Sequence, residues 1–310
     1  MLRLSAPSPQ RLEQAVALDV QVAGSEANVA AAMARLGLRT AFVSAFPAQH
    51  VWGDRAVREL AGHGVDCSRV LRPPGGRMGL YFLEYAEAPR PVRITYDRRD
   101  SAFSQVQPEA VDWSIVRQTR LVHLSGITPA LGAGPMGVVR RAIAEAAAAG
   151  VPVSFDVNYR SRLWTLAQAR AFLGEVLPAL AYLFVGADDA ATVFGLKGAP
   201  EEVLRGLRAL APRAVILLTL GEEGSAVLAG DTVHRPSRRY RVTVVDRVGA
   251  GDAFAAGFLW ATLGGQPVGP ALDAATALAA LKCTVWGDVA LVSRAELEEL
   301  LATDSTEIRR

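Results

Sequence analysis

The amino-acid sequence predicts an α/β fold with a small additional β-sheet, and three observations support this prediction. From about residue 106 onward, strand and helix patterns alternate, as they do when helices cover a parallel sheet. Four short alternating segments near the amino-terminal end lie outside this alternation. Late in the chain, a strand pattern at 240–245 leads through a glycine-rich turn into an apolar helix pattern at 253–263.

The four short segments predict a separate sheet that covers the main domain as a lid. They are residues 2–5, 16–22, 78–85 and 92–96, where apolar and polar residues alternate. We therefore expect one domain over residues 1–310, with a lid at approximately 1–23 and 76–100. The core then comprises approximately 24–75 and 101–310.

The remaining elements follow from periodicity and from glycine and proline breaks. Helices are predicted at 29–36, 51–63, 135–149, 253–263, 272–282 and 294–302, and strands at 40–45, 120–125, 151–158, 182–185, 215–219, 225–228 and 240–245.

Composition favours a small-molecule enzyme over a nucleic-acid or membrane protein. Lysine and arginine number 33 against 31 acidic residues, so the net charge of +2 offers no field that attracts nucleic acid or anionic lipid. No apolar run reaches the roughly 18 residues that a membrane span needs. Cys67 and Cys283 form no metal or redox spacing, which fits a reducing compartment. We expect a soluble cytoplasmic enzyme.

A glycine-rich turn before the helix at 253–263 is the strongest chemical signal in the chain. Gly249, Ala250 and Gly251 place backbone N–H groups at a helix N-terminus, which suits the terminal phosphate of a nucleotide. Asp252 comes directly after them, within reach of a hydroxyl that approaches this phosphate, and can take its proton. The alternative is a plain helix cap, since aspartate is among the best N-cap residues.

Residues 246–252 resemble the second signature of the ribokinase-like (PfkB) sugar kinases, Asp-Thr-Thr/Ser-Gly-Ala-Gly-Asp. Arg247 and Val248 replace its two hydroxyl residues, whereas the glycines and the final aspartate are intact. The resemblance implies a ribokinase-like three-layer α/β/α domain with a β-sheet lid. It also implies ATP as the phosphoryl donor and Mg²⁺ bound mainly to the phosphates.

Further motifs resemble the sugar-binding parts of this family, and of its 2-keto-3-deoxygluconate kinases in particular. Gly24 and Asn28 resemble the segment that grips sugar hydroxyls, although a turn and a helix cap are the alternatives. Tyr81 with Tyr96 and Arg98 resembles the lid pair that receives a sugar acid, and a guanidinium fork suits a carboxylate.

Two later segments complete the substrate site that the resemblance implies. Residues 155–164, with the pattern Phe-Asp-x-Asn-x-Arg-x-x-Leu-Trp, place Asn158 and Arg160 at the carboxyl end of a strand, where open α/β sheets bind ligands. Asp288 matches an acid near the substrate in these kinases.

The nucleotide side of the site is predicted at Thr219, Gly221 and Gly224, together with Gly249 and Gly251. The loop at 219–224 resembles the nucleotide loop of the family, and a plain hairpin is the alternative. Asp189 lies three residues after Gly186, where the family often has Asn-x-x-Glu. It is a weak candidate for holding the metal through water. The equal alternative is that Asp189 only stabilises the start of a helix.

The resemblance implies an ATP-dependent phosphotransferase of the 2-dehydro-3-deoxygluconokinase type, acting on the primary hydroxyl (O6) of 2-keto-3-deoxygluconate. The alternatives are a fructokinase or another PfkB sugar kinase, or a sugar- or nucleotide-binding module without turnover. The galactonate epimer stays open, because that choice depends on the hydrogen bonds of one hydroxyl. An exposed lid edge makes a homodimer through the lid plausible.

The resemblance covers almost the whole chain, but it is cut short at the beginning. Family members open with a hydrophobic strand that ends in Gly-Glu or Gly-Asp and lies inside the main sheet, and residues 1–4 correspond to the segment just after that strand. We therefore expect a start assigned too late or a truncated chain. Buried backbone groups beside the gap would then lack partners, at roughly 1–3 kcal/mol each.

Overall fold

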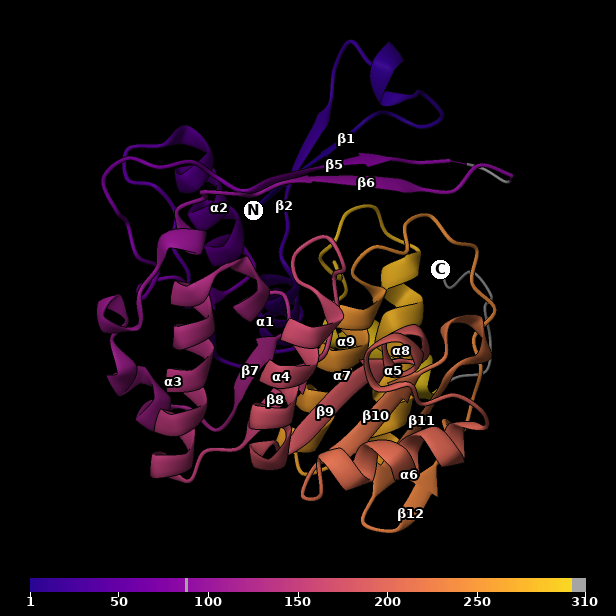
Figure 1. The fold of residues 1–310 in the computed structure, drawn as a ribbon. Helices are drawn as coiled ribbons and strands as arrows, with labels where there is room; N and C mark the ends of the chain where they lie inside the picture. Colours follow the sequence, from indigo (N-terminus) through magenta and orange to yellow (C-terminus); the bar gives the residue numbers. More distant parts are fainter. Residues whose placement is uncertain (87–88, 303–310) are drawn as a thin grey trace.

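A computed structural model describes residues 1–86 and 89–302 of the chain, and Figure 1 shows a layered main domain with a second sheet across one end. The main sheet has the strand order β12-β11-β10-β9-β8-β7. Strands β7 to β10 are parallel, whereas β11 and β12 are antiparallel to their neighbours. The strands are β7 (Val122–Ser125), β8 (Val153–Asp156), β9 (Tyr182–Gly186), β10 (Val215–Thr219), β11 (Ser225–Ala229) and β12 (Thr232–His234).

Both faces of this sheet are buried, and β10 shows why. Ile216 and Leu218 pack into one apolar cluster and Leu217 packs into the other, because successive side chains of a strand point to opposite faces. One cluster contains residues of α3 to α6 and the other contains residues of α1, α7, α8 and α9. The predicted three-layer α/β/α fold is therefore confirmed.

The helices of the described residues are α1 (Ser25–Arg35), α2 (Val51–Gly62), α3 (Ala133–Ala149), α4 (Leu166–Val176), α5 (Ala187–Phe194), α6 (Pro200–Leu210), α7 (Ala250–Leu263), α8 (Val268–Cys283) and α9 (Arg294–Ala302). Helices α4, α5 and α6 were not predicted from the sequence, whereas the others agree with the prediction to within a few residues at their ends.

The second sheet, here called the lid sheet, has the strand order β2-β1-β5-β6. Its strands are β1 (Leu2–Ser5), β2 (Asp19–Val22), β5 (Leu80–Glu84) and β6 (Arg93–Asp97). The four short segments that the sequence sets apart thus pair with one another. Strand β1 is central, antiparallel to β2 and parallel to β5. In Figure 1, β5 and β6 cross the top of the main domain.

Two strand predictions are wrong. Residues 240–245 form no strand, because the N–H groups of Val245 and Asp246 both donate to the carbonyl of Cys283 at the end of α8. The strand predicted at 40–45 is reduced to β3 (Thr40–Ala41), which pairs in parallel with β4 (Val65–Asp66). Beyond it, only an isolated bridge joins Ala45 to Leu71.

Among the described residues, no helix has both the length and the apolar character of a membrane span. Both cysteines are free thiols.

Candidate active site

The start of α7 forms a cradle of backbone N–H groups. Gly249 caps the helix with φ of 85°, in the left-handed region that favours glycine. A Cβ atom at this position would lie 2.0 Å from the carbonyl oxygen of Asp288, so no side chain fits there. The first N–H groups of a helix have no partner within it. The N–H of Ala250 donates a long hydrogen bond to the carbonyl of Arg247 at 3.2 Å, so an anion at this turn would bind first at the amide of Gly251.

Asp252 lies in the first turn of α7 and is held on both sides by α1. Its Oδ1 accepts a hydrogen bond from Ser25 Oγ at 2.6 Å, and its Oδ2 accepts one from Asn28 Nδ2 at 2.7 Å. Asn158, from the loop after β8, donates to Ser25 Oγ at 3.1 Å. The structure therefore brings Asp252, Asn28 and Asn158 together, as the sequence predicts for one site. Gly24 ends the strand-to-helix turn beside them, as the residue that caps α1.

Ser25 joins these groups, although the sequence analysis did not single it out. Its position between two predicted site residues, Gly24 and Asn28, was the available signal.

Burial controls the protonation of Asp252. It raises the pKa of this carboxyl from 3.8 to about 6, while the hydrogen bonds from Ser25 and Asn28 act in the opposite direction. The carboxylate is thus ionised at neutral pH, yet it is a stronger base than an exposed aspartate. These are the properties of a general base that works near neutrality.

Two further carboxyls lie near Asp252. The pKa of Asp156 is raised to about 8 by burial and by the charges of Asp252 and Asp189. Burial also raises the pKa of Asp189, whose Oδ2 accepts a hydrogen bond from the backbone N–H of Tyr159 at 3.0 Å. The charge of Arg160 acts on both carboxyls in the opposite direction. Asp156 was missed, although a polar residue at the carboxyl end of a buried parallel strand was the signal.

Arg98 is a buried cation with unused hydrogen-bond donors. It is 7% exposed, and its guanidinium lies 3.9 Å from the centre of the Tyr96 ring. Its Nε and Nη2 atoms are buried and have no hydrogen-bond partner among the described residues. Burial lowers the pKa of this guanidinium, and the charge of Arg160 adds to that effect. A buried guanidinium with free donors is the arrangement expected where an anionic ligand binds.

Tyr81 and Asp288 belong to a buried network instead of presenting free polar groups. The hydroxyl of Tyr81 donates to both carboxylate oxygens of Asp288 at 2.7 Å. Arg3 of β1, fully buried, donates from Nη1 to Asp288 at 2.8 Å and to Asp246 at 2.7 Å. The lid sheet is thus tied to the segment before α7. Arg3 was also missed, although an arginine within an alternating apolar strand was a visible signal.

The loop at 219–224 joins β10 to β11, so the hairpin interpretation is structurally correct. Thr219 pairs with Ser225. Gly221 and Gly224 have φ of 60° and 96°, so the sharp turn depends on glycine at both positions. Nothing in the geometry of this hairpin identifies a ligand. In the described part of the chain, no group of three or more His, Cys, Asp or Glu side chains is placed to hold a metal ion.

Comparison with known proteins gives the site its context. Residues 1–294 match the family described as pfkB family carbohydrate kinase. The chain is 36% identical to a 2-dehydro-3-deoxygalactonokinase of Haloferax volcanii, over 97% of this chain and 94% of that protein. It is also 36% identical to a 2-dehydro-3-deoxygluconokinase of Thermoproteus tenax, over 97% of this chain and 91% of that protein. The crystal structure of a 2-dehydro-3-deoxygluconokinase from Thermotoga maritima superposes with a TM-score of 0.92, at 34% identity over 98% of this chain and 96% of that one.

Proposed function

Because this chain belongs to the pfkB family of carbohydrate kinases, we propose that it transfers the terminal phosphoryl group of ATP to the primary hydroxyl (O6) of a 2-keto-3-deoxy sugar acid. The names of its relatives support this substrate class, with both the gluconate and the galactonate epimers among them.

The observation that carries the proposal is the unpaired guanidinium of Arg98. Its Nε and Nη2 are buried donors that find no acceptor in the described part of the chain, and Tyr96 fixes the plane of the group. A sugar carboxylate would satisfy both nitrogens and neutralise the charge, whereas a neutral sugar such as fructose offers no charge to neutralise. Arg160 adds a second positive charge that acts on Arg98.

In the proposed reaction, Asp252 accepts the proton of the attacking hydroxyl. Ser25 and Asn28 fix the two oxygens of this carboxylate, so its position is set before substrate binds. The N–H groups of Gly249, Ala250 and Gly251 stabilise the charge of the phosphoryl group in transit. Gly24, Asn158 and Arg160 complete the wall that orients the sugar acid.

Tyr81 and Asp288 act indirectly in this proposal. Their polar atoms pair with each other, so they shape the substrate wall through Tyr96, whose ring lies 5.8 Å from that of Tyr81.

ATP enters as a substrate together with Mg²⁺. The residues fit a nucleotide triphosphate, because Gly251 borders open space: a Cβ atom at this position would meet nothing within 4 Å. Thr219, Gly221 and Gly224 line the nucleotide in the proposal. Magnesium would bind chiefly to the phosphates and neutralise their charge, and Asp189, whose Oδ2 accepts from the N–H of Tyr159, would hold the metal through water.

Release of ADP with magnesium-ATP tests the substrate class. We expect turnover on 2-keto-3-deoxygluconate or its galactonate epimer and negligible turnover on fructose and ribose. Arg98→Met should raise KM for the acid roughly 10–100-fold, the equivalent of one or two charge-assisted hydrogen bonds. Arg99→Met, at the exposed neighbouring position, is the matched control and should change KM little. Preferred turnover on fructose would contradict the proposal.

A further inference from the structure

Lys282, in the last turn of α8, is a fully buried lysine. Its Nζ donates to the backbone carbonyl of Asp246 at 2.8 Å and to that of Val285 at 3.3 Å. Burial lowers the pKa of this ammonium, whereas the charges of Asp246 and Asp288 favour its charged form. Burying a charge is costly unless it is paired and hydrogen-bonded. The reaction proposed above makes no use of this group.

The choice of lysine at this position is unusual for the chain. Lys282 is one of only two lysines among 33 basic residues, and the other, Lys197, is exposed. Arginine presents a planar fork that suits a carboxylate, whereas an ammonium is a compact charge whose three donors can reach separate acceptors. The acceptors of Lys282 are the carbonyl oxygens of two separate peptide groups. This side chain thus serves as a point cation for backbone oxygens.

Lys282 holds a peptide group that no other contact of Asp246 orients. The carboxylate of Asp246 accepts hydrogen bonds from the N–H groups of Val248 and Gly287, both at 3.0 Å. These bonds fix the side chain but leave the peptide group between Asp246 and Arg247 able to rotate. The bond from Lys282 to the Asp246 carbonyl therefore sets the direction in which this peptide faces.

The same peptide group leads into the glycine cradle at the start of α7. The carbonyl of Arg247 accepts from the N–H of Ala250 at 3.2 Å and so shapes the turn into the helix. Gly249 packs tightly there, because a Cβ atom on it would lie 2.0 Å from the carbonyl oxygen of Asp288. A rotation of the peptide after Asp246 would thus move the amides of the cradle relative to a bound phosphate.

We propose that Lys282 is a positioning residue for phosphoryl transfer, whose ammonium fixes the peptide between Asp246 and Arg247 and thereby aims the amides of the cradle at the phosphoryl group. This inference rests on the proposed function. Because Lys282 is fully buried, it acts through the backbone and without contact with either substrate.

Lys282→Met tests the role of the ammonium, since it keeps the length of the apolar stem and removes the charge. We expect kcat to fall about 100-fold, the effect of a misplacement near 1 Å in an active site. KM for the sugar acid should change only a few-fold, because Arg98 is untouched. Lys197→Met removes the exposed lysine and is the matched control, with kcat and KM unchanged.

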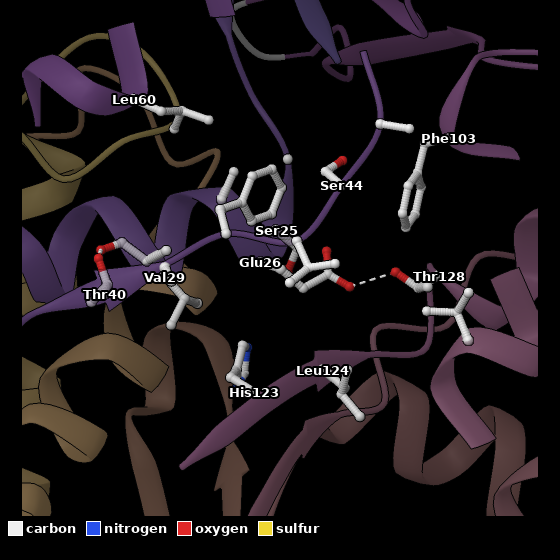
Figure 2. A pocket seen from close by; sticks show the side chains of 18 of the residues that line it. Ser25, Glu26, Val29, Thr40, Ser44, Leu60, Phe103, His123, Leu124 and Thr128 are labelled. Atoms are coloured by element: carbon white, nitrogen blue, oxygen red, sulfur yellow. Dashed lines mark hydrogen bonds between the residues drawn. The ribbon is translucent and has the colours of Figure 1, made fainter. Parts of the chain in front are cut away.

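Leu60→Ala separates positioning from a loss of stability. Leu60 of α2 is 1% exposed and lines the largely apolar cavity that Figure 2 shows, in a different apolar cluster from α7 and α8. This variant should lower Tm and leave kcat unchanged. A Lys282→Met variant that loses stability but keeps its kcat would overturn the proposal, because Lys282 would then be structural only.

Chemical rescue tests the same role without relying on Lys282→Met to fold. Lys282→Ala lacks three carbons and the nitrogen of the lysine side chain, and n-propylammonium supplies these atoms. Purified in n-propylammonium and assayed with and without it, Lys282→Ala should regain roughly tenfold or more in kcat when the amine is present. The neutral n-propanol should restore nothing. Equal effects of the two compounds would overturn the proposal.

Binding of ATP distinguishes a failure of this inference from a failure of the proposed function. Where the wild type turns over no sugar acid, the proposed function fails, and the dissociation constant of ATP decides on Lys282 instead. Calorimetry should then show roughly tenfold weaker binding of ATP to Lys282→Met than to wild type or Lys197→Met, since the cradle loses a hydrogen bond to a charged phosphate. Equal dissociation constants for the three proteins would in that case overturn the role of Lys282.

Discussion

At the scale of single residues, the protonation of Asp252 sets the expected pH dependence. Only the ionised carboxylate can accept a proton, and its pKa of about 6 means that the active form predominates above pH 6. We predict that kcat/KM for the sugar acid falls about tenfold per pH unit below this value. Measurement from pH 4.5 to 8.5 checks this.

Ser25→Ala sharpens the pH prediction. This substitution removes a hydrogen bond that lowers the pKa of Asp252. The acid limb of the pH profile, where kcat/KM falls with decreasing pH, should therefore move to higher pH. Arg141→Met, on the exposed face of α3, is the control and should leave the limb in place. A limb that moves to lower pH in Ser25→Ala would contradict the assignment.

The raised pKa of Asp156 predicts that the stability of the protein depends on pH. Its carboxyl pKa rises from 3.8 in the unfolded chain to about 8 in the folded protein, so folding retains a proton that the unfolded chain releases. The resulting stabilisation is complete below about pH 4 and is lost as pH rises through 8. Relative to wild type, Asp156→Asn should therefore gain stability between pH 5 and pH 8.

The midpoints of urea unfolding at pH 5 and at pH 8 measure this gain in stability. Exposed Asp231→Asn serves as the control, for which we expect the same difference from wild type at both pH values. A gain for Asp156→Asn that shrinks toward pH 8 would show that this carboxyl is not buried as described.

At the scale of elements, Arg3 links β1 of the lid sheet to the segment before α7. Its fully buried guanidinium binds Asp246 and Asp288, so Arg3→Met would leave two buried carboxylates without their cation. We predict a loss of about 3–5 kcal/mol in the free energy of unfolding. Chemical denaturation measures it, with Arg141→Met as the matched control, because its exposed bond to Glu145 is worth about 1 kcal/mol or less. Equal losses in both variants would contradict a structural role for the buried network.

Strand and helix positions could be predicted where a regular pattern coincided with burial. The β10 segment is apolar throughout because helices cover both its faces, and the four lid strands alternate because they form a separate sheet. Residues 240–245 carry the same alternation but form no strand. Val244 and Val245 are 58% and 48% exposed, so this local pattern did not reflect burial.

The site could be predicted in part for a similar reason. Gly249 and Asp252 lie in one contiguous motif, and local sequence is enough to find them. Ser25, Asp156 and Arg3 act through partners 90 or more positions away, or through burial in a network, and neither property is visible in a local pattern.

At the scale of the whole molecule, dimerisation through the lid remains a prediction. Strands β2 and β6 end the lid sheet, and Val16, just before β2, is 99% exposed. We expect sedimentation velocity to show a dimer that Val16→Asp weakens. Leu210→Asp at the end of α6, far from the lid sheet in Figure 1, is the control and should leave the dimer intact. A monomer at all concentrations would contradict this prediction.

The most direct test of the account is the turnover of Asp252→Asn on the keto-deoxy sugar acid. The amide keeps the shape of the side chain but cannot take the hydroxyl proton. We predict that kcat falls about 10²–10⁴-fold, while the dissociation constants of ATP and the sugar acid change only a few-fold. Near-normal turnover with unchanged binding would contradict the role of Asp252 as the general base, and with it the mechanism proposed for this site.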